Sequence, residues 1–191
     1  GPRRQFVDAV VAIAPDATGS ARNVLEAGAT IQTAMIQASL LAVILVSIFL
    51  LLILRDGRLV LSLILTLGVA GVLTTATGTL LDMPYNFANV IVLPLLVGIG
   101  VDSGIHLALR TARSQSVAGV TNSVTARAVF FSALTTIACF GSLSFSDHRG
   151  TASMGALLMI AIGWTLVTTI YLLPLVVEAT RKRPRETPIS N

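Results

Sequence analysis

The sequence predicts an all-α polytopic membrane protein, and three observations lead to this prediction. The 191 residues are 54% hydrophobic and only 12% charged, and the mean hydropathy is +0.85. Soluble domains carry about 25% charged residues, so this chain has too few to cover a water-facing surface. The apolar residues gather in five charge-poor runs, and about 20 such residues cross a bilayer as a helix. A soluble enzyme, a disordered linker and a disulfide scaffold are therefore excluded, the last because Cys139 is the single cysteine.

The five runs are the expected transmembrane helices. They cover residues 35–54, 59–81, 89–109, 128–145 and 151–177. Their apolar residues are continuous rather than alternating, and only helices or closed barrels satisfy backbone groups in lipid, so helices are expected. Asp102 is the one acid inside a run, and Pro94 in the same run should kink its helix.

The connections between the runs are short or polar. Arg55, Asp56, Gly57 and Arg58 form a tight turn, Pro84 breaks the chain before the third run, and residues 110–127 are a longer polar link. Residues 146–150 join the last two runs.

Residues 1–34 differ in character from the rest. An apolar helical pattern near the start is broken at residues 15–19, and a second helical pattern begins at Val24 and continues into the first run. This stretch has too little apolar surface to fold alone. We expect it to be the C-terminal remnant of a domain outside the cytoplasm, with the remainder upstream.

The basic residues predict the orientation. One side of the membrane receives nine of the 13 lysines and arginines: Arg55, Arg58, Arg110, Arg113, Arg127, Arg181, Lys182, Arg183 and Arg185. Cytoplasmic loops carry an excess of such residues, so this side should be cytoplasmic and residues 181–191 a cytoplasmic basic tail. The basic pI is then a sign of topology, and no nucleic acid is expected as a partner.

Asp102 is the first candidate for a functional residue. A charge inside a membrane-spanning helix costs several kcal/mol on insertion scales, so a charged residue is rare there without a role. The carboxyl is either neutral, because burial disfavours its charge, or charged and partnered, and both states respond to protonation. We expect a proton-relay residue; the alternative is a neutral Asp that only hydrogen-bonds to a neighbouring helix. His106, one helical turn towards the cytoplasm, is a second relay candidate or simply an interfacial histidine, and Ser103 is expected on another face.

Two further groups of residues belong to this hypothesis. Gly100 and Gly104 form a small-xxx-small pair, which Gly98 extends, and such pairs let helices pack closely. In the fourth run, the hydroxyl of Thr135 or Thr136 is a candidate partner of Asp102. The alternative for each hydroxyl is a local bond to the preceding turn of its own helix.

Enzyme classes find no support in the residue inventory. Two histidines and one cysteine offer no metal-ligand spacing, and no Walker loop or GxGxxG is present. An intramembrane aspartyl protease needs two facing acids, and Asp102 has no second acid within a run. We expect no enzyme and no cofactor; if the chain does work, ATP is not the obvious energy source, and the proton gradient acting through Asp102 is the candidate that the resemblance described next implies.

Two sequence blocks resemble the RND superfamily of permeases, and within it the MMPL branch. They are LLVGIGVDSGIH at residues 95–106 and FSALTTIACFGSL at residues 131–143. The segments FVDAV at 6–10, APDATG at 14–19 and SDHRG at 146–150 are most similar to hopanoid-transporting (HpnN-like) RND permeases. Ser103 departs from the branch, in which many members carry an aromatic residue after the acid.

The resemblance implies a fold and a location. The chain would be the C-terminal half of a bacterial inner-membrane permease, with the second to sixth spans of one repeat after the end of a periplasmic α+β domain. The N-terminal segment would be periplasmic and the C-terminus cytoplasmic.

The resemblance also implies a function. Protons passing Asp102 would drive export of a hydrophobic, hopanoid-like lipid, with His106, Thr135 and Thr136 in the relay. Alternatives are a lipid sensor similar to sterol-sensing domains and a protein-export accessory of the same superfamily. The implied partners are membrane lipids, the lipid cargo, the N-terminal half of the permease and, in a homo-oligomer, further copies.

Overall fold

The computed structural model describes residues 20–83, 89, 91–114 and 117–180, and these residues are almost entirely helical. The elements in chain order are α2 (Ser20–Leu54), α3 (Gly57–Leu80), α5 (Val92–Arg113), α6 (Val117–Thr121), α7 (Val124–Ser142), η1 (Leu143–Phe145), α8 (Arg149–Val167), η2 (Thr168–Leu172) and α9 (Leu173–Thr180). No strand occurs among the described residues. The expected α+β domain end, residues 1–34, lies partly outside them, since residues 1–19 are not described.

Five segments are long and apolar enough to cross a membrane, which confirms the predicted all-α multi-pass membrane protein. They are Thr33–Leu54, Gly57–Leu80, Val92–Arg113, Val124–Phe145 and Arg149–Thr180. The third and fourth extend further into the polar link than the charge-free runs, so that Arg113 and Arg127 lie on helices. Long basic side chains can lie along a helix end while their charged heads reach water, so an arginine does not terminate the helix.

Pro94 does not lie in the interior of its helix. α5 begins at Val92, so Pro94 occupies the first turn, where the missing N–H has no intrahelical partner to lose. Asn89 is helical and Ile91 is a turn, so the regular helix is interrupted just before Pro94, and a bend of the span at this proline stays a prediction.

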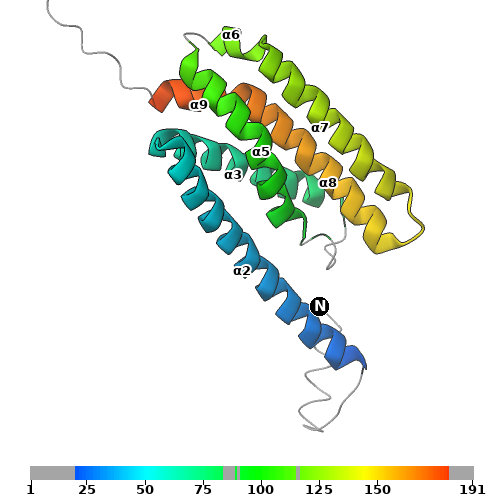
Figure 1. Ribbon diagram of the computed structural model, residues 1–191. Helices are drawn as coiled ribbons and strands as arrows, with labels where there is room; N and C mark the ends of the chain where they lie inside the picture. Colours follow the sequence, from blue (N-terminus) through cyan, green and yellow to red (C-terminus); the bar gives the residue numbers. More distant parts are fainter. Residues whose placement is uncertain (1–19, 84–88, 90, 115–116, 181–191) are drawn as a thin grey trace, which may run out of the picture.

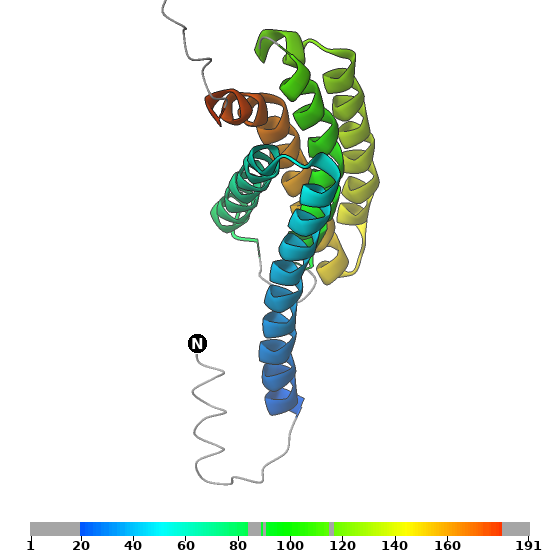
Figure 2. The same ribbon diagram turned by 60° about the vertical axis from the view of Figure 1, so that its left-hand side comes forward.

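α2 continues without a break from Ser20 to Leu54. At 1.5 Å per residue its 35 residues span about 50 Å, which is longer than the bilayer core. Figures 1 and 2 show its N-terminal part projecting beyond the other helices. Residues 20–34, part of the segment expected to belong to a preceding domain, are thus helical and continuous with the first span.

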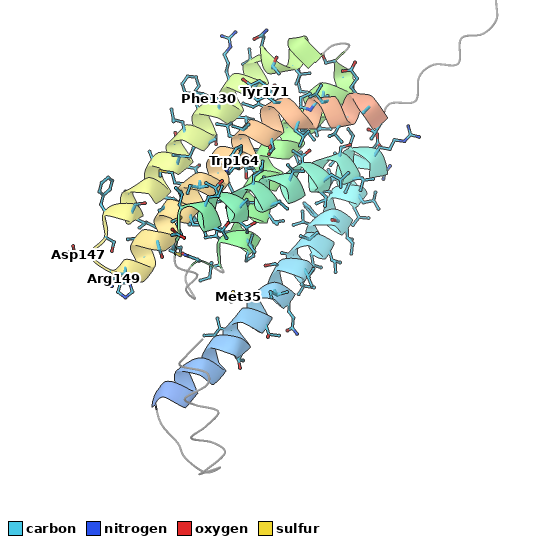
Figure 3. The ribbon with its side chains drawn as sticks, turned by 180° about the vertical axis from the view of Figure 1, so that it is seen from behind. Met35, Phe130, Asp147, Arg149, Trp164 and Tyr171 are labelled. Carbon is cyan, nitrogen blue, oxygen red and sulfur yellow. The ribbon has the colours of Figure 1, made fainter. Side chains whose placement is uncertain are left out.

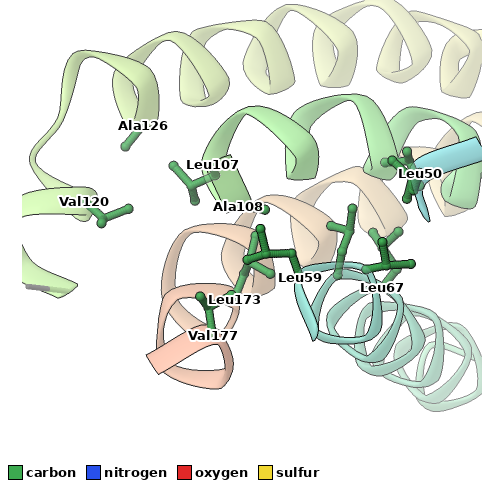
Figure 4. Close-up of a cluster of buried hydrophobic side chains, with 12 residues drawn as sticks. Leu50, Leu59, Leu67, Leu107, Ala108, Val120, Ala126, Leu173 and Val177 are labelled. Carbon is green, nitrogen blue, oxygen red and sulfur yellow. The ribbon is translucent and has the colours of Figure 1, made fainter. Parts of the chain in front are cut away.

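α5 lies within the bundle and contacts α2, α3, α7, α8 and α9. A cluster of buried apolar residues fills the space between α2, α3, α5 and α9; Leu50, Leu63, Leu107 and Leu173 are all 0% exposed in it (Figure 4). α7 packs most extensively on α8. Between α8 and α3, the indole N–H of Trp164, which is labelled in Figure 3, donates to Thr77 Oγ1 at 2.9 Å.

The described arginines are distributed unevenly between the two ends of the bundle. The turn from α2 to α3, the link around α6 and the end of α9 lie towards one end, and the turn from α7 to α8 lies towards the other (Figures 1 and 2). The first end carries Arg55, Arg58, Arg110, Arg113 and Arg127, whereas the turn at the other end carries Arg149.

Candidate functional site

Asp102 lies at the middle of α5. It is the eleventh of the 22 residues from Val92 to Arg113, so about 15 Å of helix lies on either side. In the charge-free run 89–109 Asp102 is the fourteenth of 21 residues, but the helix continues through Arg110 to Arg113. Its side chain is exposed and has no hydrogen bond or ion pair to any described residue. A carboxyl thus lies halfway along an apolar helix, without a partner in the part of the chain that the structure describes.

Asp102 lines a groove formed by α5, α7 and α8. One part of the groove, about 390 Å³, is bordered by all three helices. A second part, about 420 Å³, lies between α5 and α7. The two parts share Asp102, Ser103, Val129 and Ser132, and we call them together the Asp102 groove. A groove of this size beside a titratable group is large enough to admit water or the side chains of another helix.

His106 lines the second part of the groove together with Asp102. The two side chains are four residues apart on α5, and so occupy neighbouring positions on one face of the helix. His106 lies on the side of Asp102 that leads towards Arg110 and Arg113. The structure thus brings these two predicted relay residues into one groove.

Ser103 is placed differently from the expectation. It lines both parts of the groove, although we expected it on another face. Consecutive helical residues are separated by about 100°, so Asp102 and Ser103 can flank a groove that is wider than one side chain.

Thr135 and Thr136 are not placed alike. The Thr136 side chain lines the first part of the groove, and its hydroxyl donates to Ser132 O at 2.9 Å. Thr135 is exposed, lines neither part, and its hydroxyl donates to Phe131 O at 2.9 Å. Both hydroxyls therefore donate to the preceding turn of α7, and only that of Thr136 is on the same groove as Asp102.

Sequence reasoning missed two hydroxyls of the groove, those of Thr125 and Thr165. Thr125, Val129, Ser132 and Thr136 follow one another at helical spacing and all face the groove from α7. That spacing was available in the sequence as a signal for Thr125. Thr165, on α8, donates to Ala161 O at 2.8 Å and has no comparable pattern around it.

The three glycines of α5 fall on two faces. A Cβ on Gly100 would meet Leu67 of α3 and the Thr165 methyl of α8, and a Cβ on Gly104 would meet Leu63 of α3. Gly100 and Gly104 thus allow α3 to pack closely on α5. Gly98 instead borders the Asp102 groove, and a Cβ there would meet nothing within 4 Å.

The chemistry available in the groove is proton exchange and hydrogen bonding. It combines one carboxyl, one imidazole and the hydroxyls of Ser103, Thr125, Ser132, Thr136 and Thr165. Among the described residues, no three His, Cys, Asp or Glu side chains gather closely enough to hold a metal ion. Carboxyl and imidazole groups can each take up and release a proton, and hydroxyls with water can connect them.

Comparison with curated proteins gives two similar chains. The sequence is 42% identical to the hopanoid transporter HpnN of Rhodopseudomonas palustris (strain TIE-1) over 171 residues, which are 90% of this chain and 20% of that protein. It is 37% identical to the hopanoid transporter HpnN of Burkholderia multivorans (strain ATCC 17616 / 249) over 178 residues, 93% of this chain and 20% of that protein. No family model matches the chain. The chain spans about one fifth of the length of these relatives, and the matches confirm its resemblance to HpnN-like RND permeases.

Proposed function

We propose, from this likeness to hopanoid transporters, that the chain is the C-terminal membrane part of a proton-driven permease that exports a hopanoid-like lipid from the bacterial inner membrane. The names of the two relatives support the lipid cargo and the transport activity. The observation that carries the proton coupling is the position of Asp102, at the middle of α5 and in a groove with His106 and five hydroxyl side chains.

The energetics of Asp102 favour a functional role. A charged Asp at the centre of a membrane helix costs about 2.5–3.5 kcal/mol on insertion scales, and a side chain that only packed there would be cheaper as a neutral residue. Among the described residues nothing pairs with its carboxyl, so the cost is not offset within this part of the bundle. The N-terminal half of the permease, which these residues do not include, is the proposed cover of the groove.

The groove supplies a proton path of two steps. His106 lies on the side that leads to the arginine-rich end of the bundle, and Ser103 and Ser132 border both parts of the groove. A proton taken up by the Asp102 carboxylate removes its charge, and a neutral carboxyl costs far less to enclose in an apolar seam. Protonation therefore shifts the balance between an open groove and one closed by a neighbouring helix. Release of the proton through His106 to the cytoplasm resets this balance.

The orientation of the path follows from the arginines. Arg55, Arg58, Arg110, Arg113 and Arg127 lie towards one end of the bundle, and an excess of positive charge marks the cytoplasmic side. The N-terminal segment is then periplasmic and the C-terminus cytoplasmic. Protons would enter from the periplasm, pass Asp102 in the middle, and leave near His106.

The test is an amide substitution at Asp102 in the full-length permease. We expect Asp102→Asn to reduce proton-gradient-driven hopanoid movement in proteoliposomes to the level of vesicles without protein, because the amide cannot take up a proton. Asp147→Asn is the matched control, since Asp147 is an exposed Asp in the turn between α7 and α8, outside the groove.

The outcomes separate the candidate functions. Loss of movement in Asp102→Asn, with Asp147→Asn unaffected and both proteins inserted, supports the relay. Gradient-driven movement at the wild-type rate in Asp102→Asn contradicts it. A protein that binds hopanoid, moves none, and is indifferent to the gradient would instead be a lipid sensor.

A further inference from the structure

The last span contains a break in its helical register. Between α8 and α9, residues Thr168–Leu172 form a π-helical turn, which we call the π turn. Its closing bond runs from the Leu173 N–H to Thr168 O, five residues back. Short π segments within α-helices occur often at functional sites, and they are a recognised cause of bends.

The backbone of the π turn contains an acceptor that the helix does not satisfy. In an α-helix the Leu173 N–H would bond to Thr169 O, but here it bonds to Thr168 O. In the π register the next donor to Thr169 O would be residue 174, which is a proline and has no N–H. The regular ladder therefore offers no donor to the carbonyl of Thr169.

The side chain of the same residue is also unsatisfied. Thr169 is 0% exposed, and its hydroxyl has no hydrogen-bond partner among the described residues. The neighbouring Thr168 differs, because its hydroxyl donates to Trp164 O at 2.9 Å. A buried polar group without a partner is costly, so the unpartnered Thr169 hydroxyl, beside a carbonyl to which the ladder offers no donor, marks a weak point in the hydrogen bonding of this helix.

The two helices joined by the π turn share two neighbours, α3 and α5, and differ in a third. Ile162, Thr165 and Leu166 of α8 border the Asp102 groove just before the turn. α8 and α9 both pack on α3 and α5, but α8 also packs extensively on α7, whereas α9 packs on α6. Figures 1 and 2 show α9 bent away from the axis of α8. A change in bend at this point would move the groove wall relative to α9.

We propose that the π turn is the hinge of the last span, about which α8 and the groove wall move relative to α9 during the transport cycle. This inference rests on the proposed function for its cycle, but the bending itself is a property of the chain. Pro174 is the residue that makes the hinge, because it lacks the N–H that the Thr169 carbonyl would accept in the π register. The groove can then open on the α8 side of the π turn without breaking a backbone hydrogen bond.

The experiment restores the missing donor. Pro174→Ala in the full-length permease supplies an N–H at position 174, and Pro174→Gly supplies the same N–H but keeps the backbone flexible. Pro94→Ala is the matched control, because Pro94 lies in the first turn of α5, outside the π turn. Each variant is reconstituted in lipid, and two quantities are measured: amide hydrogen exchange over residues 168–178, and gradient-driven hopanoid movement.

The hinge predicts a specific pattern. Pro174→Ala should slow exchange over residues 168–178 by roughly tenfold, as one added backbone hydrogen bond would, and should slow hopanoid movement to a similar degree. Pro174→Gly should restore most of the wild-type exchange rate and of the wild-type hopanoid movement. Pro94→Ala should change neither of these two quantities. Wild-type exchange in this segment as slow as in the middle of α8 overturns the hinge, as does Pro174→Ala that slows exchange yet transports normally.

The hinge and the proposed function fail in different ways. If the wild-type protein moves no hopanoid, the proposed function fails, and the exchange data alone still decide whether the π turn bends. If Pro174→Ala and Pro174→Gly both lose transport with unchanged exchange, Pro174 serves packing and the hinge is wrong.

Discussion

Gly155 determines how closely α8 approaches the end of α7. A Cβ at this position would lie 2.7 Å from Leu143 Cβ, 2.8 Å from Phe140 O and 2.9 Å from Ser144 N. Two of these atoms belong to the backbone, which cannot turn aside as a flexible side chain can. The absence of a side chain at Gly155 is thus what permits the tight connection through η1.

We expect Gly155→Ala to lower the free energy of unfolding by about 1–3 kcal/mol, the usual cost of overpacking. The matched control is Gly163→Ala in the same helix, where a Cβ would meet nothing within 4 Å. That variant should be neutral or more stable, by at most about 1 kcal/mol, because alanine favours the helix. Thermal unfolding in detergent compares the two, and equal melting temperatures would show that α7 and α8 are not packed as described.

At the scale of residues, the sequence was enough to single out Asp102 as an acid within an apolar run, but not to predict which residues surround it. A lone acid in an apolar run stands out by composition, and His106 follows from the four-residue spacing. The positions of Ser103 and Thr165 depend on which helices flank α5, and no local pattern encodes that. Thr135 and Thr136 are adjacent, and periodicity alone could not decide which of them faces the groove.

At the scale of elements, one hydrogen bond joins α8 to α3 through side chains. The Trp164 N–H donates to Thr77 Oγ1 at 2.9 Å, and the Thr77 hydroxyl donates to Leu73 O at 2.8 Å. The indole is half-buried, so the bond lies at the seam between the two helices rather than on an open surface. It therefore joins α3 to α8, which forms one wall of the Asp102 groove, in the conformation that the structure describes.

A double-mutant cycle measures this bond. Trp164→Phe and Thr77→Val should each lower the free energy of unfolding, and the double variant should lose less than the sum. The expected coupling is about 0.6 kcal/mol, the average found for hydrogen bonds between membrane helices. Strictly additive losses would mean that the two side chains do not interact in the folded protein.

The elements themselves were largely predictable, because a run of some 20 apolar residues has few structures open to it in lipid. All five spans occur, and the differences are at their ends, as in the extension of α5 to Arg113. The π turn was not predicted, since hydrophobic periodicity does not distinguish a bond to the fifth preceding residue from one to the fourth. Pro174 in the sequence indicates a weak point, but not the register change before it.

At the scale of the whole molecule, the helices differ in how much of their surface the bundle covers. In the most apolar window of each span, 44% of the residues are buried in α3, against 6% in α2 and 11% in α7. α2 and α7 therefore lie at the edge, and their apolar faces are left uncovered by the other described helices. The opening of the Asp102 groove, which α7 borders, belongs to this uncovered part of the bundle.

The most direct test of the central claim, that proton uptake in this groove drives lipid export, is hopanoid movement by the wild-type full-length permease in proteoliposomes. Movement and internal pH are recorded together, with an imposed pH gradient and after a protonophore has collapsed it. We predict that hopanoid moves only while the gradient lasts and that protons flow in step with it. Hopanoid movement that continues at the same rate after the collapse, with no accompanying proton flow, would contradict the account.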